Sequence, residues 1–296
     1  MSFDLSRYLA EKRKRVDAAL DRFLPQDPEN PLICAMRYSL LAKGKRIRPI
    51  LCLATGEALH MAEPDVLLPA ACALEMVHAY SLIHDDLPAM DDDDLRRGVP
   101  TCHKKHGEAV AILAGDALLT LAFDVSSRPG AFPMDPAIQL AVINILAQAA
   151  GHLGMVEGQS QDLRFEGSAL SFNTLKNLHR LKTGALIGAS VKSGALLAGA
   201  HQDTFEALTR YAHCIGLAFQ VTDDILDVEG DPHVLGKSVG SDAERGKNTY
   251  PALLGLAQAK TVARQLIDDA LTALASFDDA ATPLRAIANH ILLRQR

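Results

Sequence analysis

The feature that most constrains this chain is a set of long segments that are apolar on almost every face of a helix. Residues 68–86 and 184–200 have no continuous polar side that could face water. Such helices must be covered by other helices, and patterns typical of strands are weak throughout the chain. We therefore predict an all-α fold. One large helical bundle with buried central helices would form a single domain over residues 1–296.

Helical periodicity is interrupted by proline and glycine at several points, which set the expected helix limits. The predicted helices span residues 3–23, 31–42, 68–86, 108–126, 136–165, 171–199, 203–228, 249–257 and 259–275.

Composition excludes several classes of protein. The net charge of −6 argues against a nucleic-acid partner, which would require a basic face. Five scattered cysteines without a CxxC pair predict reduced thiols and a cytoplasmic location. The N-terminal residues lack the apolar core of a signal peptide. The run 184–200 is short and contains Lys192, so we expect no membrane span.

An acidic cluster fills residues 84–98, HDDLPAMDDDDLRRG. It places six aspartates and two arginines between Asp85 and Arg97. Leu87-Pro88 ends the preceding helix. Asp85 at the helix end and Asp91 in the loop can therefore turn toward one site. A solvated acidic loop is the simpler interpretation of residues 91–94 taken alone.

A second acidic cluster lies far along the chain in FQVTDDILD, residues 219–227. Asp223 and Asp227 are four residues apart and share a helix face, with Asp224 between them and Gln220 one turn earlier. Buried carboxylates need a partner. Oxygen-only ligands favour a hard cation, and an incomplete cage favours Mg²⁺ shared with a phosphate. Together the two clusters predict a metal-bridged diphosphate site.

Basic residues stand where they could complete such a site. Arg96 and Arg97 directly follow the first acidic cluster and can donate to outer phosphate oxygens. Further candidates are Lys43, Lys45, Arg46 and Arg48 in LAKGKRIRP, Lys182 beside Thr183 in an apolar helix, and Lys237 and Lys247 in the Gly- and Lys-rich residues 235–251. An ordinary solvated loop is the alternative for the first and last of these segments. His78 shares a helix face with Asp85, and Gln159 and Asp162 form either a core pair or a support for the site.

Taken in order, GKRIRP, DDLPAMDDDDLRRG, GQSQD, KT, FQVTDDILD and GKSVGSDAERGKNTYP resemble the motifs of the trans-polyprenyl diphosphate synthases. The DDxxxxD form is similar to that of bacterial farnesyl diphosphate synthases. The resemblance covers nearly the whole chain. It implies an all-α fold with a large central cavity and a homodimer. The implied reaction is condensation of isopentenyl diphosphate with dimethylallyl or geranyl diphosphate to give (2E,6E)-farnesyl diphosphate.

The resemblance also implies a role for each motif residue. Asp85 and Asp91, with Asp86 in support, would bind two of three Mg²⁺ ions, and Asp223, with Asp224 and Asp227, the third. The allylic diphosphate would be held by Arg96, Lys182 and Lys237, with Lys247 nearby. Isopentenyl diphosphate would be held by Lys45, Arg48, His78 and Arg97. Thr183, Gln220 and the Lys182 carbonyl would face the allylic cation, and the departing diphosphate would take the proton because no protein base is evident.

Product length is expected to depend on the floor of the cavity. Tyr80 lies five residues before Asp85, about 7.5 Å along a helix, with Ser81 beside it. A bulky aromatic residue here resembles farnesyl-forming members, so we predict a C15 product. Tyr80 as an ordinary core residue is the alternative.

Four other functions are alternatives to farnesyl diphosphate synthesis. A geranylgeranyl synthase differs mainly at the floor. A terpene cyclase should lack GKRIRP, and a non-catalytic subunit of a heteromeric synthase should lack aspartates that are present here. A phosphohydrolase would need a base that we do not find. Arg294 and Arg296 resemble a basic tail over the isopentenyl site.

Overall fold

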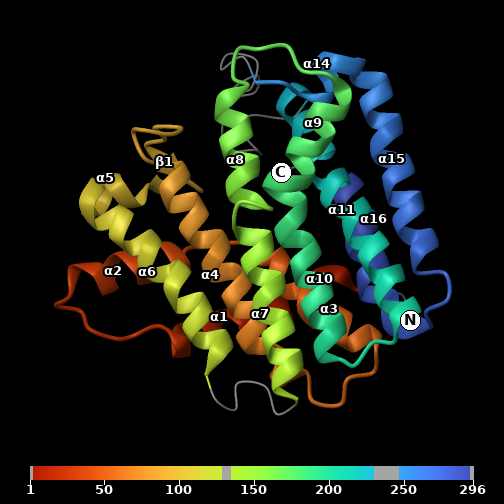
Figure 1. The fold of residues 1–296 in the computed structure, drawn as a ribbon, viewed down its shortest axis with the longest axis horizontal. Helices are drawn as coiled ribbons and strands as arrows, with labels where there is room; N and C mark the ends of the chain where they lie inside the picture. The colour runs from red at the N-terminus through yellow and green to blue at the C-terminus, as the bar shows by residue number, and fades with distance from the viewer. Residues whose placement is uncertain (1–2, 129–134, 230–246, 294–296) are drawn as a thin grey trace.

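The computed structural model describes residues 3–128, 135–229 and 247–293, and this part of the chain is a bundle of helices (Figure 1). The predicted all-α fold is confirmed. The helices are α1 (Leu5–Phe23), α2 (Pro31–Leu40), α3 (Ile47–Ala58), η1 (Pro64–Leu67), α4 (Leu68–Asp85), α5 (Cys102–His106), α6 (Glu108–Ser127), α7 (Pro136–Ala150), α8 (Met155–Arg164), α9 (Phe172–His179), η2 (Arg180–Gly184), α10 (Ala185–Leu197), α11 (Gln202–Glu229), α14 (Tyr250–Leu254), α15 (Leu256–Ala273), η3 (Asp279–Ala281) and α16 (Thr282–Leu293). A small antiparallel hairpin joins β1 (Leu95–Arg96) to β2 (Val99–Pro100).

The two segments that were expected to be buried, α4 and α10, lie in the interior. Helix α4 packs on α6 and α3, and α10 packs on α3, α7 and α11. Gly194 of α10 shows why small residues recur in that segment. A methyl group at this position would lie 2.4 Å from the carbonyl oxygen of Cys52 on α3. Glycine therefore permits the close contact between these two central helices.

The predicted helix ranges differ from the structure in several places. They did not include α3, α5 or α16, and residues 136–165 form α7 and α8 instead of one helix. The break between them follows from Gly151 and Gly154, because a side chain at Gly154 would lie 2.1 Å from the Ala149 carbonyl oxygen. Pro283 is the second residue of α16, where a proline needs no backbone donor.

Within the described residues, three helical segments are long and apolar enough to cross a membrane, judged by length and composition alone. They are Pro64–Asp85, Glu108–Ser127 and Pro136–Arg164. The first is 72% buried inside the bundle and is a core helix. The other two are 39% and 28% buried, so each carries an apolar face that the rest of the described chain does not cover.

Candidate active site

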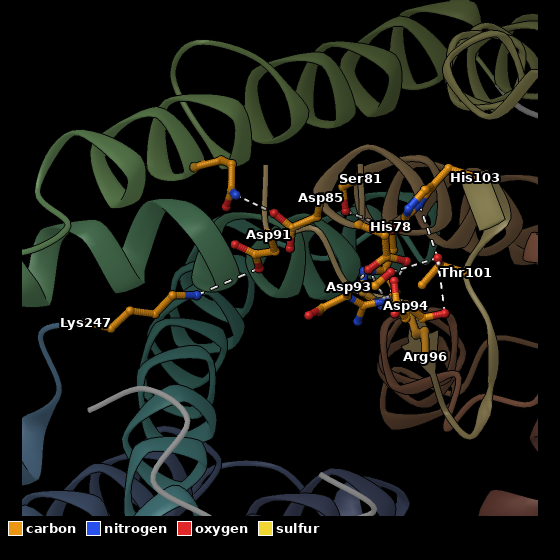
Figure 2. A network of polar contacts seen from close by, with 12 residues as sticks. His78, Ser81, Asp85, Asp91, Asp93, Asp94, Arg96, Thr101, His103 and Lys247 are labelled. Carbon is orange, nitrogen blue, oxygen red and sulfur yellow. Dashed lines mark hydrogen bonds and ion pairs between the residues drawn. The ribbon is translucent and has the colours of Figure 1, made fainter. Parts of the chain in front are cut away.

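The first acidic cluster begins where α4 ends. Pro88 cannot continue the helix, and the chain turns back so that the Asp91 N–H donates to the Asp85 carbonyl oxygen at 2.9 Å. Further backbone bonds from Met90 and Asp92 to the Leu87 carbonyl close the turn at 2.8 and 3.1 Å. This local structure explains the spacing of the DDxxxxD motif. Four intervening residues let the loop return, and Figure 2 shows Asp85 and Asp91 lying beside each other.

Asp85 is half-buried and sits among opposing charges. Burial raises the pKa of its carboxyl group, the Lys182 ammonium opposes this effect, and the Asp91 carboxylate adds to it. The Gln159 side-chain amide of α8 donates to Asp85 Oδ1. Lys247 lies 3.8 Å from Asp91 Oδ2 (Figure 2). Two neighbouring carboxylates with their charge only partly offset are suited to a hard cation.

The π-helical turn η2 connects this cluster to the second acidic helix. Its Lys182 Nζ donates to Asp162 Oδ2 at 2.6 Å, and Thr183 Oγ1 donates to Gln220 Oε1 of α11 at 2.9 Å. Burial alone would lower the pKa of Lys182, but the Asp162 and Asp85 charges raise it above its ordinary value. The Lys182 charge therefore interacts with Asp85 of the first acidic cluster, and the next residue is hydrogen-bonded to the helix of the second. π turns are frequent at functional sites.

Gly158 is what allows α8 to approach η2. A methyl group at Gly158 would lie 2.2 Å from the Lys182 nitrogen and 2.5 Å from its Cα. Gly158→Ala should therefore displace the turn, and overpacking of this kind costs about 1–3 kcal/mol of stability. Denaturant unfolding would measure the loss of stability, and steady-state kinetics would measure the effect of the displaced turn on activity. Gly188→Ala, in α10 with open space around it, is the matched control. It should be neutral or stabilising, and an equal loss in both variants would contradict the assignment.

The second acidic cluster lies on α11, with Asp224 and Asp227 buried and Asp223 half-buried. Asp224 accepts hydrogen bonds from Gln220 Nε2 at 3.1 Å and from the Tyr250 N–H at 2.9 Å. Among the described residues no three His, Cys, Asp or Glu side chains are grouped closely enough to hold a metal by themselves. Mg²⁺ is usually held by one or two carboxylates together with substrate phosphates and water. The donor chemistry therefore fits Mg²⁺ shared with a diphosphate.

Asp86 points elsewhere than Asp85. The two oxygens of its buried carboxylate share the single Nε–H of Arg96, at 2.7 and 2.9 Å from Nε. Arg96 stands in β1, and the β1–β2 turn uses Arg97 and Gly98 with φ of 55° and 79°. A positive φ at both residues is typical of a type I′ hairpin turn. Asp86 therefore fixes Arg96 and the hairpin, whereas Asp85 interacts with Asp91 and the Lys182 charge.

The basic segment before α3 divides into two parts. Arg46 is 4% exposed and donates to Asp17 Oδ1 at 2.8 Å and Glu75 Oε1 at 2.7 Å. It is therefore a structural residue, which its sequence neighbours did not indicate. Arg48 is different, because its buried Nε has no hydrogen-bond partner among the described residues. An unpaired buried donor is costly, which favours an anionic ligand at this position.

Arg48 connects this segment to the other clusters. Burial lowers the pKa of its guanidinium, and the charges of Glu75 and Asp223 oppose that effect. Burial and the neighbouring Arg48 and Arg97 charges also lower the pKa of His78 well below its ordinary value. His78 is therefore neutral at pH 7 and would contact a phosphate as a hydrogen-bonding group. Arg97 Nη1 donates to the Lys43 carbonyl at 2.7 Å.

The remaining predicted residues are placed as follows. Lys45 is exposed, Tyr80 is 6% exposed in α4, and Ser81 Oγ donates to the His78 carbonyl at 2.8 Å. Lys237, Arg294 and Arg296 lie outside the described residues.

Two supporting residues were not predicted from the sequence. Asn248 fixes the irregular segment beside Lys247 by donating to the Ser168 carbonyl at 2.8 Å and accepting from the Leu170 N–H at 3.2 Å. Glu75 anchors Arg46. Asn248 stands within the motif GKNTYP. Glu75 is a single charge in an apolar helix, and this isolation was a signal in the sequence that Glu75 needs a partner.

Comparison with known proteins agrees with this geometry. Residues 29–285 match the family model described as polyprenyl synthetase. The chain is 48% identical to the farnesyl diphosphate synthase of Escherichia coli over 99% of this chain and 100% of that one. It is 51% identical to the farnesyl diphosphate synthase of Geobacillus stearothermophilus over 86% of each chain. The crystal structure of a geranylgeranyl pyrophosphate synthetase from Pyrococcus horikoshii superposes with a TM-score of 0.90 at 31% identity, covering 98% of both chains.

A family match over most of the chain and two relatives of this similarity identify the family without further argument. The chain is a prenyltransferase that belongs to the polyprenyl synthetase family.

Proposed function

We propose that this protein condenses isopentenyl diphosphate with dimethylallyl and then geranyl diphosphate to give (2E,6E)-farnesyl diphosphate. The observation that carries the proposal is the continuity of the site. Asp85 and Asp91 lie beside Lys182, and the next residue, Thr183, is bonded to Gln220 on the second acidic helix. One diphosphate could therefore contact both clusters, while Arg48 and His78 offer a separate position for a second diphosphate.

Mg²⁺ fits this site, with Asp85, Asp91, Asp223 and Asp227 as the residues that would hold up to three ions. When bound, it would neutralise the diphosphate and favour its departure. Lys182 and Lys247 are placed to contact the same anion. Lys182 remains protonated because Asp162 and Asp85 raise its pKa.

The reaction breaks the C1–O bond of the allylic substrate, and the electron pair leaves with the diphosphate. The isopentenyl double bond then attacks C1, which forms the new C–C bond. A proton leaves the adjacent carbon to restore a double bond, and the departed diphosphate is its acceptor. Thr183 is buried and hydrogen-bonded to Gln220, so two uncharged oxygens would stand beside the proposed cation. Holding both substrates at one site lowers the entropic barrier to attack.

The decisive experiment supplies labelled isopentenyl diphosphate with dimethylallyl or geranyl diphosphate, with and without Mg²⁺, and identifies the products by chromatography. We expect Mg²⁺-dependent C15 diphosphate from either primer. A C20 product would favour the geranylgeranyl synthase alternative, release of phosphate or cyclic hydrocarbon would indicate another reaction class, and no product from the pure protein would indicate a non-catalytic subunit.

We also propose a cytoplasmic homodimer built from single-domain subunits. Helices α6 and α7 contact each other and expose large apolar side chains. Leu113 is 55% exposed and Leu140 67% exposed, and they belong to a face that a second copy would cover. Contact between two identical faces is the commonest form of homodimer.

Combining Leu113→Glu with Leu140→Glu should convert the protein to a monomer, because buried unpaired carboxylates destabilise an apolar interface. Light scattering coupled to size exclusion would measure the mass. Leu293→Glu, which changes an exposed leucine on α16, is the control and should leave the mass unchanged. A wild-type monomer, or a double variant that stays dimeric, would contradict this interface.

A further inference from the structure

A chain of three hydrogen bonds runs from η2 through α11 to the first residue of α14. Thr183 Oγ1 donates to Gln220 Oε1 at 2.9 Å, and Gln220 Nε2 donates to Asp224 Oδ1 at 3.1 Å. The main-chain N–H of Tyr250 donates to Asp224 Oδ2 at 2.9 Å. Thr183 is 9% and Asp224 2% exposed, so water competes little for these bonds.

The direction of this relay is determined at its Asp224 end. The Tyr250 N–H can only donate, and an ionised carboxylate can only accept. Gln220 must therefore turn its NH₂ group toward Asp224, which leaves its carbonyl oxygen facing Thr183. The Thr183 hydroxyl has a single hydrogen, and Gln220 receives it. Both lone pairs of Thr183 Oγ1 consequently remain for another contact.

We propose that Asp224 is a positioning residue, and that it makes Thr183 present oxygen lone pairs to the developing allylic cation. This inference rests on the proposed prenyl transfer and assigns Asp224 a role other than metal ligation. A hydroxyl hydrogen facing the cation would repel it, whereas a lone pair stabilises it. Preorganised dipoles of this kind cost no rearrangement during the reaction.

The substitution Asp224→Asn should reverse the relay with almost no change in volume. The Tyr250 N–H would take the new carbonyl oxygen, and the new amide would donate to Gln220. Gln220 would then turn over and donate to Thr183, whose hydrogen would point toward the cation. We expect kcat to fall about 10- to 100-fold, with little change in the KM for the allylic diphosphate or in the Mg²⁺ concentration at half-maximal activity.

A binding experiment separates this role from metal or diphosphate binding. Calorimetry in saturating Mg²⁺ would compare two analogues of dimethylallyl diphosphate. One carries a protonated amine that mimics the cation, and the other is a thiolodiphosphate whose prenyl group is uncharged. Asp224→Asn should weaken binding of the amine about 10- to 100-fold and leave binding of the thiolodiphosphate nearly unchanged. Equal loss for both analogues would overturn the proposal and favour metal ligation.

A double-variant cycle tests the path through Thr183. Thr183→Val removes the hydroxyl, so adding Asp224→Asn to it should not weaken amine binding further, whereas Thr183→Ser should keep the full effect. Independent, multiplying losses would overturn the proposal. Gln220→Met breaks the relay at its centre and must show the same selective loss, which covers the case where Asp224→Asn does not fold. If the wild-type protein binds neither analogue and condenses no substrates, the proposed function itself fails.

Discussion

Asp85→Asn should lower kcat/KM at saturating Mg²⁺ by at least about 10³-fold while the protein stays folded. Asp85 receives the Gln159 amide, faces Lys182 and is joined to Asp91 by a backbone hydrogen bond. The substitution keeps the shape of the side chain and removes one charge of the carboxylate pair. Initial rates of condensation measured over a range of Mg²⁺ concentrations would give the size of the loss.

The melting temperature should separate this loss from unfolding. Burial raises the pKa of Asp85, so its charged form is less favourable in the folded than in the unfolded chain. Above the folded pKa, removing that charge should leave the metal-free protein equally or more stable. Asp92→Asn is the matched control, because Asp92 is exposed and lies in the same loop. Near-normal activity of Asp85→Asn would refute the metal assignment.

Tyr80→Ala should change the main product from C15 to C20 or longer. The Tyr80 side chain is 6% exposed, one and a half turns before Asp85 on α4, and its ring packs edge-on against His84 with centroids 5.7 Å apart. Removing the ring opens space along the helix below the acidic cluster, where an extended chain could lie. Chromatography of the dephosphorylated products would measure the distribution.

Two controls accompany this substitution. Tyr80→Phe keeps the ring and should retain C15, whereas Ser81→Ala should change little because that hydroxyl is bonded within α4. Removing a buried aromatic side chain costs about 3–5 kcal/mol, so products should be compared well below the melting temperature of the variant. An unchanged C15 product from a folded Tyr80→Ala variant would assign Tyr80 to the core alone.

The helical class and the position of the acidic clusters could be predicted because their causes are local. Apolar faces of α4 and α10 require burial, and Pro88 ends a helix whatever lies around it. The same local rules failed between α7 and α8. The sequence alone does not show that Gly151 and Gly154 end the helix, because a helix can contain glycine. The turn between α7 and α8 depends on the close approach of Gly154 to the Ala149 carbonyl oxygen.

Neighbouring residues of one type have different environments, which no local pattern could have shown. The Asp85 carboxylate interacts with the Lys182 charge, whereas Asp86 is hydrogen-bonded to Arg96. Arg46 is hydrogen-bonded to Glu75, whereas the buried Nε of Arg48 has no hydrogen-bond partner in the described part of the chain. Successive side chains on a helix or turn point in different directions. Their partners come from other elements, namely α1 and α4 for Arg46, η2 for Asp85 and β1 for Asp86.

By itself, the order of residues determined an all-α bundle, two acidic motifs, and the kinds of side chain able to hold a metal-bound diphosphate. Only the tertiary structure decided which of those side chains meet. It placed Lys182 against the first motif and Thr183 against the second, and it directed Asp224 to Gln220 and Tyr250. The physical reason is that charge and hydrogen-bonding capacity belong to a residue, whereas the direction of a hydrogen bond depends on the neighbours that packing supplies.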